Sequence, residues 1–136
     1  MAREAILRDT KPLVSRRYTC ATSTGIPKGT FLGLSGDQTA TAGTTNQTFL
    51  GFAHADVNRS TDSNFNTETS VTADKGGMYE LTASGAIVLG NYVKMASDNY
   101  VMGATEADMG SSLARVIGIA TETATTGEQI NVEVFP

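Results

Sequence analysis

The sequence predicts an all-β protein: a small β-barrel or β-sandwich of two similar units, preceded by an extended N-terminal arm. Its 136 residues include twenty threonines and fourteen glycines, while only 18% of the residues are charged. This balance favours strands and turns over helices. Short apolar runs with a period of two are also separated by turn residues along the chain. A chain of this length can bury one sizeable core, so we expect a single folded domain.

Residues 1–24 have weak periodicity and are expected to form the arm. Pro12 and the polar run 19–24 favour extended chain, which becomes ordered when it lies on another surface. The β domain is then predicted to span residues 25–136. Six of the ten basic residues, and only two of the fourteen acidic residues, fall within residues 1–28. The chain therefore combines a basic arm with an acidic body.

The basic side chains of the arm are its candidate binding residues. They are interleaved with apolar side chains and are few for a nucleic-acid footprint, which depends on many phosphate contacts. An acidic protein surface, or the acidic body of a neighbouring copy, is the better expected partner. The candidate residues are Arg3, Arg8, Lys11, Arg16 and Arg17.

The first part of the β domain is predicted to hold two strands. A turn at 25–29, rich in Gly and Pro, leads into a strand at 30–34. Residues 38–48 are rich in Thr and Gly, which favours a loop that has room for one weak edge strand. Strand character returns at 49–53.

Strands follow at closer spacing from residue 70 onwards. A turn at 75–77 leads into an alternating strand at 78–83. Strands at 91–95 and 100–102 are joined by a short polar turn, which predicts a hairpin. Residues 103–112 form a polar connection, in which one helical turn is expected around 106–109.

The last hairpin is the clearest element of the sequence. An apolar run at 116–120 is followed by turn residues at 125–128. Ile130, Val132 and Val134 then alternate with polar side chains, so the final strand is expected to bury one face.

The two strands at 49–53 and 116–120 share the pattern apolar-apolar-Gly-apolar-Ala. Each follows a similar earlier strand, at 29–34 and 90–95, after a turn and a polar stretch. The chain therefore reads as two units of roughly forty residues, each of which would expose an apolar face by itself. Packing the two units together hides both faces.

Catalytic and metal-binding signals are weak. His54 is the single histidine, which excludes a histidine-based metal cluster, and we expect it at a strand end bonded to backbone or solvent. The polar window 56–70 has the acidic alternation of a calcium loop but lacks its central Gly and final Glu. Glu106 and Asp108 lie in a loop without an apolar pocket to shift a pKa. We therefore expect no metal, no cofactor and no enzymatic activity.

The compartment follows from the apolar segments and the single cysteine. No apolar stretch reaches 18 residues, and the first residues lack the apolar core of a secretory signal, so we expect a soluble protein made in the cytoplasm, without a membrane partner. Cys20 has no partner for an internal disulfide and is expected to be a small buried hydrophobe.

Three segments resemble the small capsid decoration proteins of tailed double-stranded-DNA viruses, over about four-fifths of the chain. The first is the strand Leu-Gly-Phe-Ala at 50–53. The second is the central run at 77–93, GMYELTASGAIVLGNYV, and the third is VIGIA at 116–120 with GEQINV at 127–132. The polar window and the basic arm are longer than in the plainest members of that family.

The resemblance implies a β-tulip-like structural protein that binds the outer surface of the assembled capsid and stabilises it. It further implies a homotrimer, the major capsid protein as partner, and location on the virion after synthesis in the host cytoplasm. The arm would then lie on the capsid or clasp a neighbouring subunit. An alternative is a β-rich adhesion or head-fibre module that binds host surface carbohydrate, for which Tyr92, Tyr100 and Phe65 are the candidate aromatic contacts, with Tyr92 expected to point inward by alternation.

Overall fold

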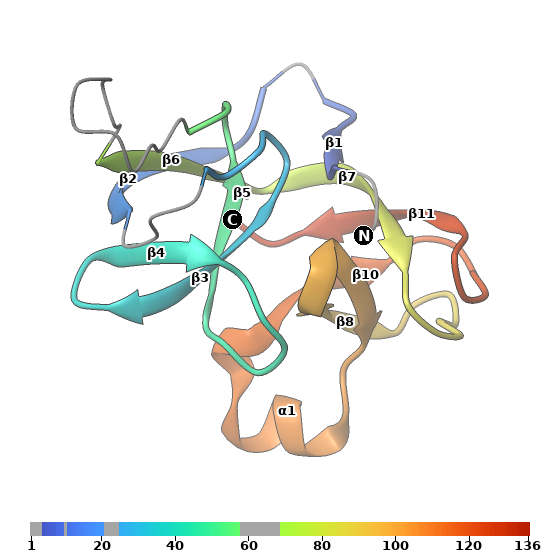
Figure 1. Cartoon of the computed structure of the whole chain (residues 1–136). Helices are drawn as coiled ribbons and strands as arrows, with labels where there is room; N and C mark the ends of the chain where they lie inside the picture. The colour runs from blue at the N-terminus through green and yellow to red at the C-terminus, as the bar shows by residue number, and fades with distance from the viewer. Residues whose placement is uncertain (1–3, 10, 21–24, 58–68) are drawn as a thin grey trace.

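The computed structural model describes residues 4–9, 11–20, 25–57 and 69–136. Two β-barrels lie side by side, with the N-terminal half of the chain in one and the C-terminal half in the other (Figure 1). The N-terminal half contains β1 (Ile6–Leu7), β2 (Val14–Cys20), β3 (Phe31–Gly36), β4 (Thr39–Ala42), β5 (Phe49–Ala53) and β6 (Ser70–Lys75). The C-terminal half contains β7 (Gly77–Ala83), β8 (Tyr92–Ala96), the 3-10 turn η1 (Ser97–Asn99), β9 (Tyr100–Gly103), α1 (Glu106–Ser111), the 3-10 turn η2 (Leu113–Arg115), β10 (Val116–Ala120) and β11 (Gln129–Val134).

Each barrel is a closed ring of five strands with the same topology. The first has the order β2-β4-β3-β5-β6, and the second has the order β7-β11-β10-β8-β9. A short parallel pairing closes each ring, between β2 and β4 in the first and between β7 and β9 in the second. All other pairings are antiparallel, and β1 adds to β7. The all-β prediction is confirmed, and so is the division into two similar units.

The duplication extends to the strand register. Phe31 lies opposite Phe52 in the first barrel, and Tyr92 lies opposite Ile119 in the second. One residue further along, each pair of strands contains an irregularity at the same place. The bridge between Ile26 and Val57 also recurs, between Ile87 and Ala124. Paired residues of the strands can therefore be matched between the two barrels.

The glycine in the repeated motif has a packing reason. Gly51 has φ +141°, and a Cβ added to it would lie 2.7 Å from the carbonyl oxygen of Asp74 on β6. A Cβ on Gly118, the matching residue, would collide with the carbonyl oxygen of Glu133 on β11. Only glycine lets the two strands approach this closely. The shared sequence pattern therefore records a shared close approach of two backbones.

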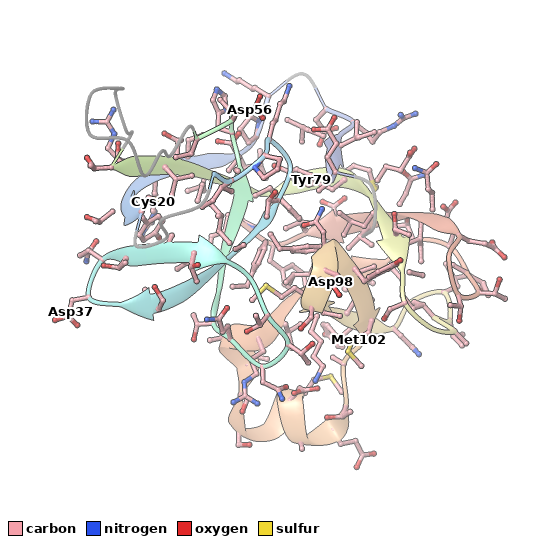
Figure 2. The ribbon with its side chains drawn as sticks, viewed as in Figure 1. Cys20, Asp37, Asp56, Tyr79, Asp98 and Met102 are labelled. Carbon is pink, nitrogen blue, oxygen red and sulfur yellow. The ribbon has the colours of Figure 1, made fainter. Side chains whose placement is uncertain are left out.

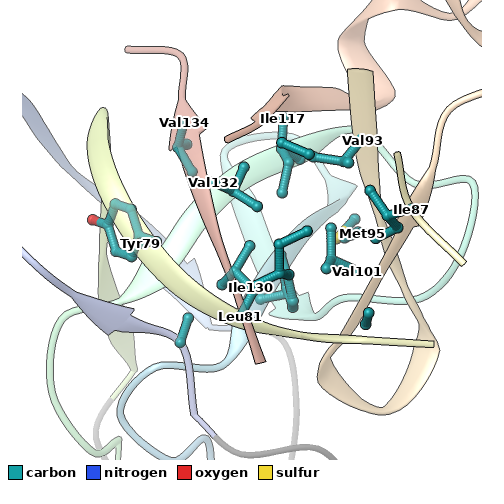
Figure 3. Packing of buried hydrophobic residues seen from close by; sticks show 14 of the residues in the cluster. Tyr79, Leu81, Ile87, Val93, Met95, Val101, Ile117, Ile130, Val132 and Val134 are labelled. Carbon is teal, nitrogen blue, oxygen red and sulfur yellow. The ribbon is translucent and has the colours of Figure 1, made fainter. Parts of the chain in front are cut away.

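The interior contains two apolar clusters. The smaller cluster fills the first barrel and includes Cys20, as expected for a buried thiol. The larger cluster fills the second barrel, where Ile130, Val132 and Val134 point inward from β11 (Figure 3). This larger cluster also includes three phenylalanines of the first barrel, Phe31, Phe49 and Phe52.

Those phenylalanines form the junction between the barrels. The Phe52 ring stacks on Tyr79 of β7 with centroids 4.3 Å apart and planes 29° apart. Figure 2 places Tyr79 between the two barrels. Asn99 ties the backbones together, because its Oδ1 accepts from Phe31 N–H at 2.7 Å and its Nδ2 donates to the Gly29 carbonyl at 3.1 Å. The two barrels are thus joined by an aromatic contact with a polar bridge beside it.

The N-terminal region differs from the expected free arm. Val14–Cys20 is β2, a full strand of the first barrel that pairs with β6 along six residues. β1 pairs with β7, and Ala5 N–H donates to the Gly29 carbonyl at 2.9 Å. The strand signal of β2 is weak because β4 flanks only its last two residues, which leaves Ser15, Arg16 and Arg17 exposed.

One smaller expectation also needs correction. β4 lies between β2 and β3 inside the closed ring, so it is not an edge strand. The expected turn at 75–77 is confirmed, and it connects the last strand of the first barrel, β6, to the first strand of the second, β7. The expected helical turn near 106–109, the hairpin of β8 with β9 and the hairpin of β10 with β11 are all confirmed.

Candidate functional site

The described residues contain no group of three metal-ligating side chains. Within the same residues, no helix is long and apolar enough to cross a membrane. Asp56, the first residue of the polar window, accepts the Lys28 backbone N–H at 2.7 Å. Residues 58–68, which hold the rest of the possible calcium loop and Phe65, lie outside the described residues. The candidate sites that the described residues offer are clusters of polar side chains and exposed apolar surfaces.

A polar cluster lies near the junction of the barrels. His54 Nδ1 lies 2.6 Å from Asp74 Oδ2, and Ser15 Oγ donates to Asp74 Oδ1 at 2.6 Å. His54 follows a strand end and its side chain is 59% exposed, but the ring Nδ1 bonds a carboxylate, which was not predicted from the sequence. Ser15 and His54 both bond the same carboxylate instead of each other, so this cluster lacks the hydrogen bond by which a histidine activates a serine.

A cavity of about 380 Å³ opens beside this cluster and beneath the N-terminal segment. Lys11 and Lys28 line it together with His54, Asp74 and Tyr79. Burial raises the pKa of Tyr79, and the nearby Asp74 and Asp9 carboxylates raise it further. The Tyr79 hydroxyl has no hydrogen-bond partner among the described residues. A phenol that stays protonated, beside a carboxylate engaged by two partners, gives this cavity little reactivity.

The predicted basic residues are spread over the N-terminal half. Arg8 follows β1 and forms an exposed ion pair with Glu80, at 3.5 Å. Lys11 is exposed at the cavity, and the side chains of Arg16 and Arg17 are exposed on β2. Arg3 lies outside the described residues. The fold therefore does not gather these residues on one free arm.

The acidic pair near α1 has a structural arrangement. Asp108 Oδ2 accepts from the Thr105 backbone N–H at 2.8 Å and lies 2.9 Å from the Lys94 ammonium. The Thr105 N–H, the Lys94 contact and the Thr105 hydroxyl together lower the pKa of Asp108 to about 2, despite its burial. Glu106 is exposed at the start of the helix. Asp108 thus completes a capping box and a buried ion pair, neither of which is arranged for proton transfer.

An exposed apolar groove is the feature that sequence reasoning missed. It has a volume of about 340 Å³ and lies between the sheet of the second barrel and the segment that contains α1 and η2. Leu113 is 65% exposed and Tyr92 is 42% exposed. Tyr92 points outward because Val93 and Met95, which have the opposite parity, fill the barrel interior, so the inward prediction is wrong. The groove is lined by Tyr92, Met109, Leu113, Val116 and Phe135.

The sequence carried one signal for this groove. Tyr92 stands where the first unit has Phe31, and Val116 stands where it has Phe49. Phe135 at the end of the chain adds an aromatic ring whose centroid is 6.2 Å from that of Tyr92. Sequence alone could not show whether the face with Phe31 and Phe49 or the matching face with Tyr92 and Val116 would be covered.

Comparison with known proteins identifies a similar fold. No family model and no curated protein matches the sequence. Among solved structures, the chain is similar to the head fiber gp8.5 N base of bacteriophage phi29, with a TM-score of 0.56 and 17% sequence identity. The similarity covers 90% of this chain and 93% of that one. At this identity the comparison shows a shared fold, which extends over both barrels.

Proposed function

We propose that this chain is a structural protein of a phage virion that binds the outer surface of the assembled capsid and stabilises it. The observation that carries the proposal is the similarity to a phage head-fibre base over nearly the whole length of both chains. The resemblance of segments 50–53, 77–93 and 116–132 to capsid decoration proteins supports the same location from the sequence side.

The surface chemistry supports a binding role and offers little for catalysis. The described residues include an exposed apolar groove and separate exposed basic side chains, whereas the His54 and Asp108 clusters are engaged in structural bonds. A protein present in many copies on a shell binds through repeated weak contacts and needs no reactive group or cofactor. The proposal therefore assigns the major capsid protein and other copies of this chain as partners.

Within this proposal, the basic residues of the N-terminal half contact acidic groups of the capsid. Arg17 on β2 and Lys11 at the cavity are exposed, and Arg8 is half-exposed beside Glu80. Exposed cations increase the association rate and add modest affinity at each site. Repetition over the shell would multiply that affinity.

Co-sedimentation with empty heads of the phage that encodes the chain tests this role. The triple variant Arg8→Gln, Lys11→Gln and Arg17→Gln should lose head binding, while circular dichroism and melting temperature stay near those of the wild type. Surface substitutions of this kind change stability by about 0.5 kcal/mol or less. Deletion of residues 1–17 would be a poor test, because it removes β1 and half of β2.

The control is the double variant Lys75→Gln and Arg115→Gln. Lys94 is left unchanged because it is buried. This control lowers the charge of the chain without touching the first 28 residues, and it should still bind heads. If the triple variant decorates heads at wild-type occupancy, these basic residues do not contribute to capsid binding. Absence of wild-type binding to heads would reject the proposed function itself.

The second candidate is a head-fibre or adhesion module that binds host surface carbohydrate. It is favoured by the similarity to a phage head-fibre base and by the exposed Tyr92 ring. Aromatic faces can stack on sugars when polar partners lie beside them. Retention of the protein by host-surface glycan, lost in Tyr92→Ala but not in Tyr100→Ala, would favour this candidate.

A further inference from the structure

The two barrels meet through one face of each, and the duplication supplies a second copy of both faces. The first barrel contributes a phenylalanine face, which lies outside its own core and joins the core of the second barrel. The strand registers match every residue of this face with a residue of the second barrel. Phe31, Phe49 and Phe52 correspond to Tyr92, Val116 and Ile119.

The second barrel contributes one of its ends, marked by Tyr79 and Met95. These side chains have the parity of the barrel interior and belong to the same buried cluster as the three phenylalanines, with the Phe52 ring stacked on Tyr79. Tyr79 has the same position in the pairing of β7 with β11 as Arg16 has in the pairing of β2 with β6. Met95 has the same position in the pairing of β8 with β9 as Leu34 has in the pairing of β3 with β4. We call the surface formed by Arg16 and Leu34 the open end of the first barrel.

Neither of the second copies of these faces is fully covered within the chain, although Val116 in the groove face is buried. Tyr92 is 42% exposed where Phe31 is 1% exposed, and Leu34 is 40% exposed where Met95 is 1% exposed. The turns beside Phe31 and Tyr92 also differ in how closely other residues cover them. A Cβ added to Gly29 would meet Glu4 and Ala5, whereas nothing lies within 4 Å of the matching position at Gly90.

We propose that copies of this chain associate head to tail, so that the groove face of one copy covers the open end of the first barrel in the next. The interface would repeat between chains the contact that joins the barrels within a chain. The groove face comprises Tyr92, Val116 and Ile119 with the flanking Leu113 and Phe135. A surface that fits one barrel end is suited to its structural duplicate, and exposed apolar patches of this kind mark interaction sites.

Charge supports this pairing. Asp74 of the first barrel lies near Tyr79 at the junction and raises its pKa. The residue that matches Asp74 is Glu133, and the residue that matches Tyr79 is Arg16. The proposed contact therefore brings an exposed carboxylate of one copy to an exposed guanidinium of the next, where such pairs fix register and partner choice.

The proposed interface uses two different faces, so it is heterologous. Such an interface forms a closed ring when the rotation between copies closes, and an open chain when it does not. Each copy has one groove face and one open end, so association stops growing only where a ring closes. This inference concerns the contact between copies and holds or fails independently of the capsid as a partner.

Mixing two interface variants tests the head-to-tail arrangement. Leu34→Asp removes the open end and Tyr92→Asp removes the groove face, so light scattering should give a monomer for each variant. A mixture of the two has one intact interface per pair and should give a one-to-one dimer and nothing larger. Leu13→Asp, at an exposed leucine that packs on Gly76 outside both faces, should leave the wild-type mass unchanged.

A charge exchange tests the register. Arg16→Glu and Glu133→Arg should each weaken self-association by about tenfold or more, and the double variant should recover most of the loss. The inference is overturned if the wild type is a monomer at its highest soluble concentration. It is equally overturned if the mixed variants remain monomers, or if the double variant is no better than the single ones. Head binding by a monomeric wild type would separate this failure from failure of the proposed function.

Discussion

Phe31 and Tyr92 occupy the same position in two copies of one fold, yet Phe31 is buried against the other barrel and Tyr92 is exposed in a groove. The strands that pair with them are matched between the barrels, and so are the isolated bridges that lie before them in the chain. The difference in burial arises because the second barrel covers this face of the first, whereas only the segment with α1 and η2 lies beside the matching face of the second. The same relationship underlies the proposed self-association.

The Tyr79 hydroxyl should be dispensable for stability. It is buried without a hydrogen-bond partner among the described residues, and such a group costs free energy relative to an apolar one. Tyr79→Phe keeps the stacking on Phe52 and should raise the free energy of unfolding by about 1 kcal/mol, measured by urea denaturation. Tyr79→Ala, which removes the ring, should lower it by about 3 kcal/mol or more. A destabilised Tyr79→Phe variant would show that the hydroxyl has a bonding role.

Alanine should be poorly tolerated at the two glycines of the repeated motif. Gly51→Ala and Gly118→Ala would each drive a Cβ into the backbone of the neighbouring strand, at Asp74 and at Glu133. Overpacking of this kind costs about 1–3 kcal/mol, so thermal unfolding should occur several degrees lower. Gly85→Ala is the matched control, because nothing lies within 4 Å of its added Cβ. Equal melting temperatures for Gly118→Ala and Gly85→Ala would contradict the close approach.

Asn99 should be required for the junction through its amide group. Asn99→Gly keeps the positive φ of 67° without strain but removes the acceptor for the buried Phe31 N–H. We expect a loss of about 1–3 kcal/mol in the free energy of unfolding. Gln38→Gly is the control, because Gln38 precedes β4 as Asn99 precedes β9, and it also has a positive φ but is exposed. A control that loses as much stability as Asn99→Gly would assign the effect to the hairpin turn alone.

Acid should weaken the fold through Asp108. Its pKa falls from the usual 3.8 to about 2 in the folded protein, mainly because the Thr105 N–H and Lys94 favour the charged carboxylate. A lowered folded pKa gives stability that is fully present above pH 4 to 5 and is lost as the pH falls towards 2. Asp108→Asn should therefore be less stable than the wild type at pH 6, and the difference should shrink between pH 5 and pH 2. Denaturant unfolding at several pH values measures this, and a constant difference would contradict it.

The class of the fold and its duplication could both be predicted from the amino-acid sequence. The abundance of Thr and Gly, the alternation in β11 and the shared motif at 49–53 and 116–120 are local properties, and local hydrogen bonding and strand twist act on them directly. Gly51 and Gly118 could be matched by pattern because the close approach that requires them occurs in both units. The hairpins of the second barrel followed for the same reason, since their strands are neighbours in the chain.

Tertiary structure decided the features that depend on distant partners. β2 was hidden in a basic segment because its pairing with β6 joins residues more than fifty positions apart, and the exposed Arg16 and Arg17 obscure the alternation. The His54 and Asp74 contact, the buried Lys94 and the outward Tyr92 likewise follow from packing between strands of different hairpins. Which of two matched apolar faces is covered depends on the order of the barrels in space, and no local pattern contains that information.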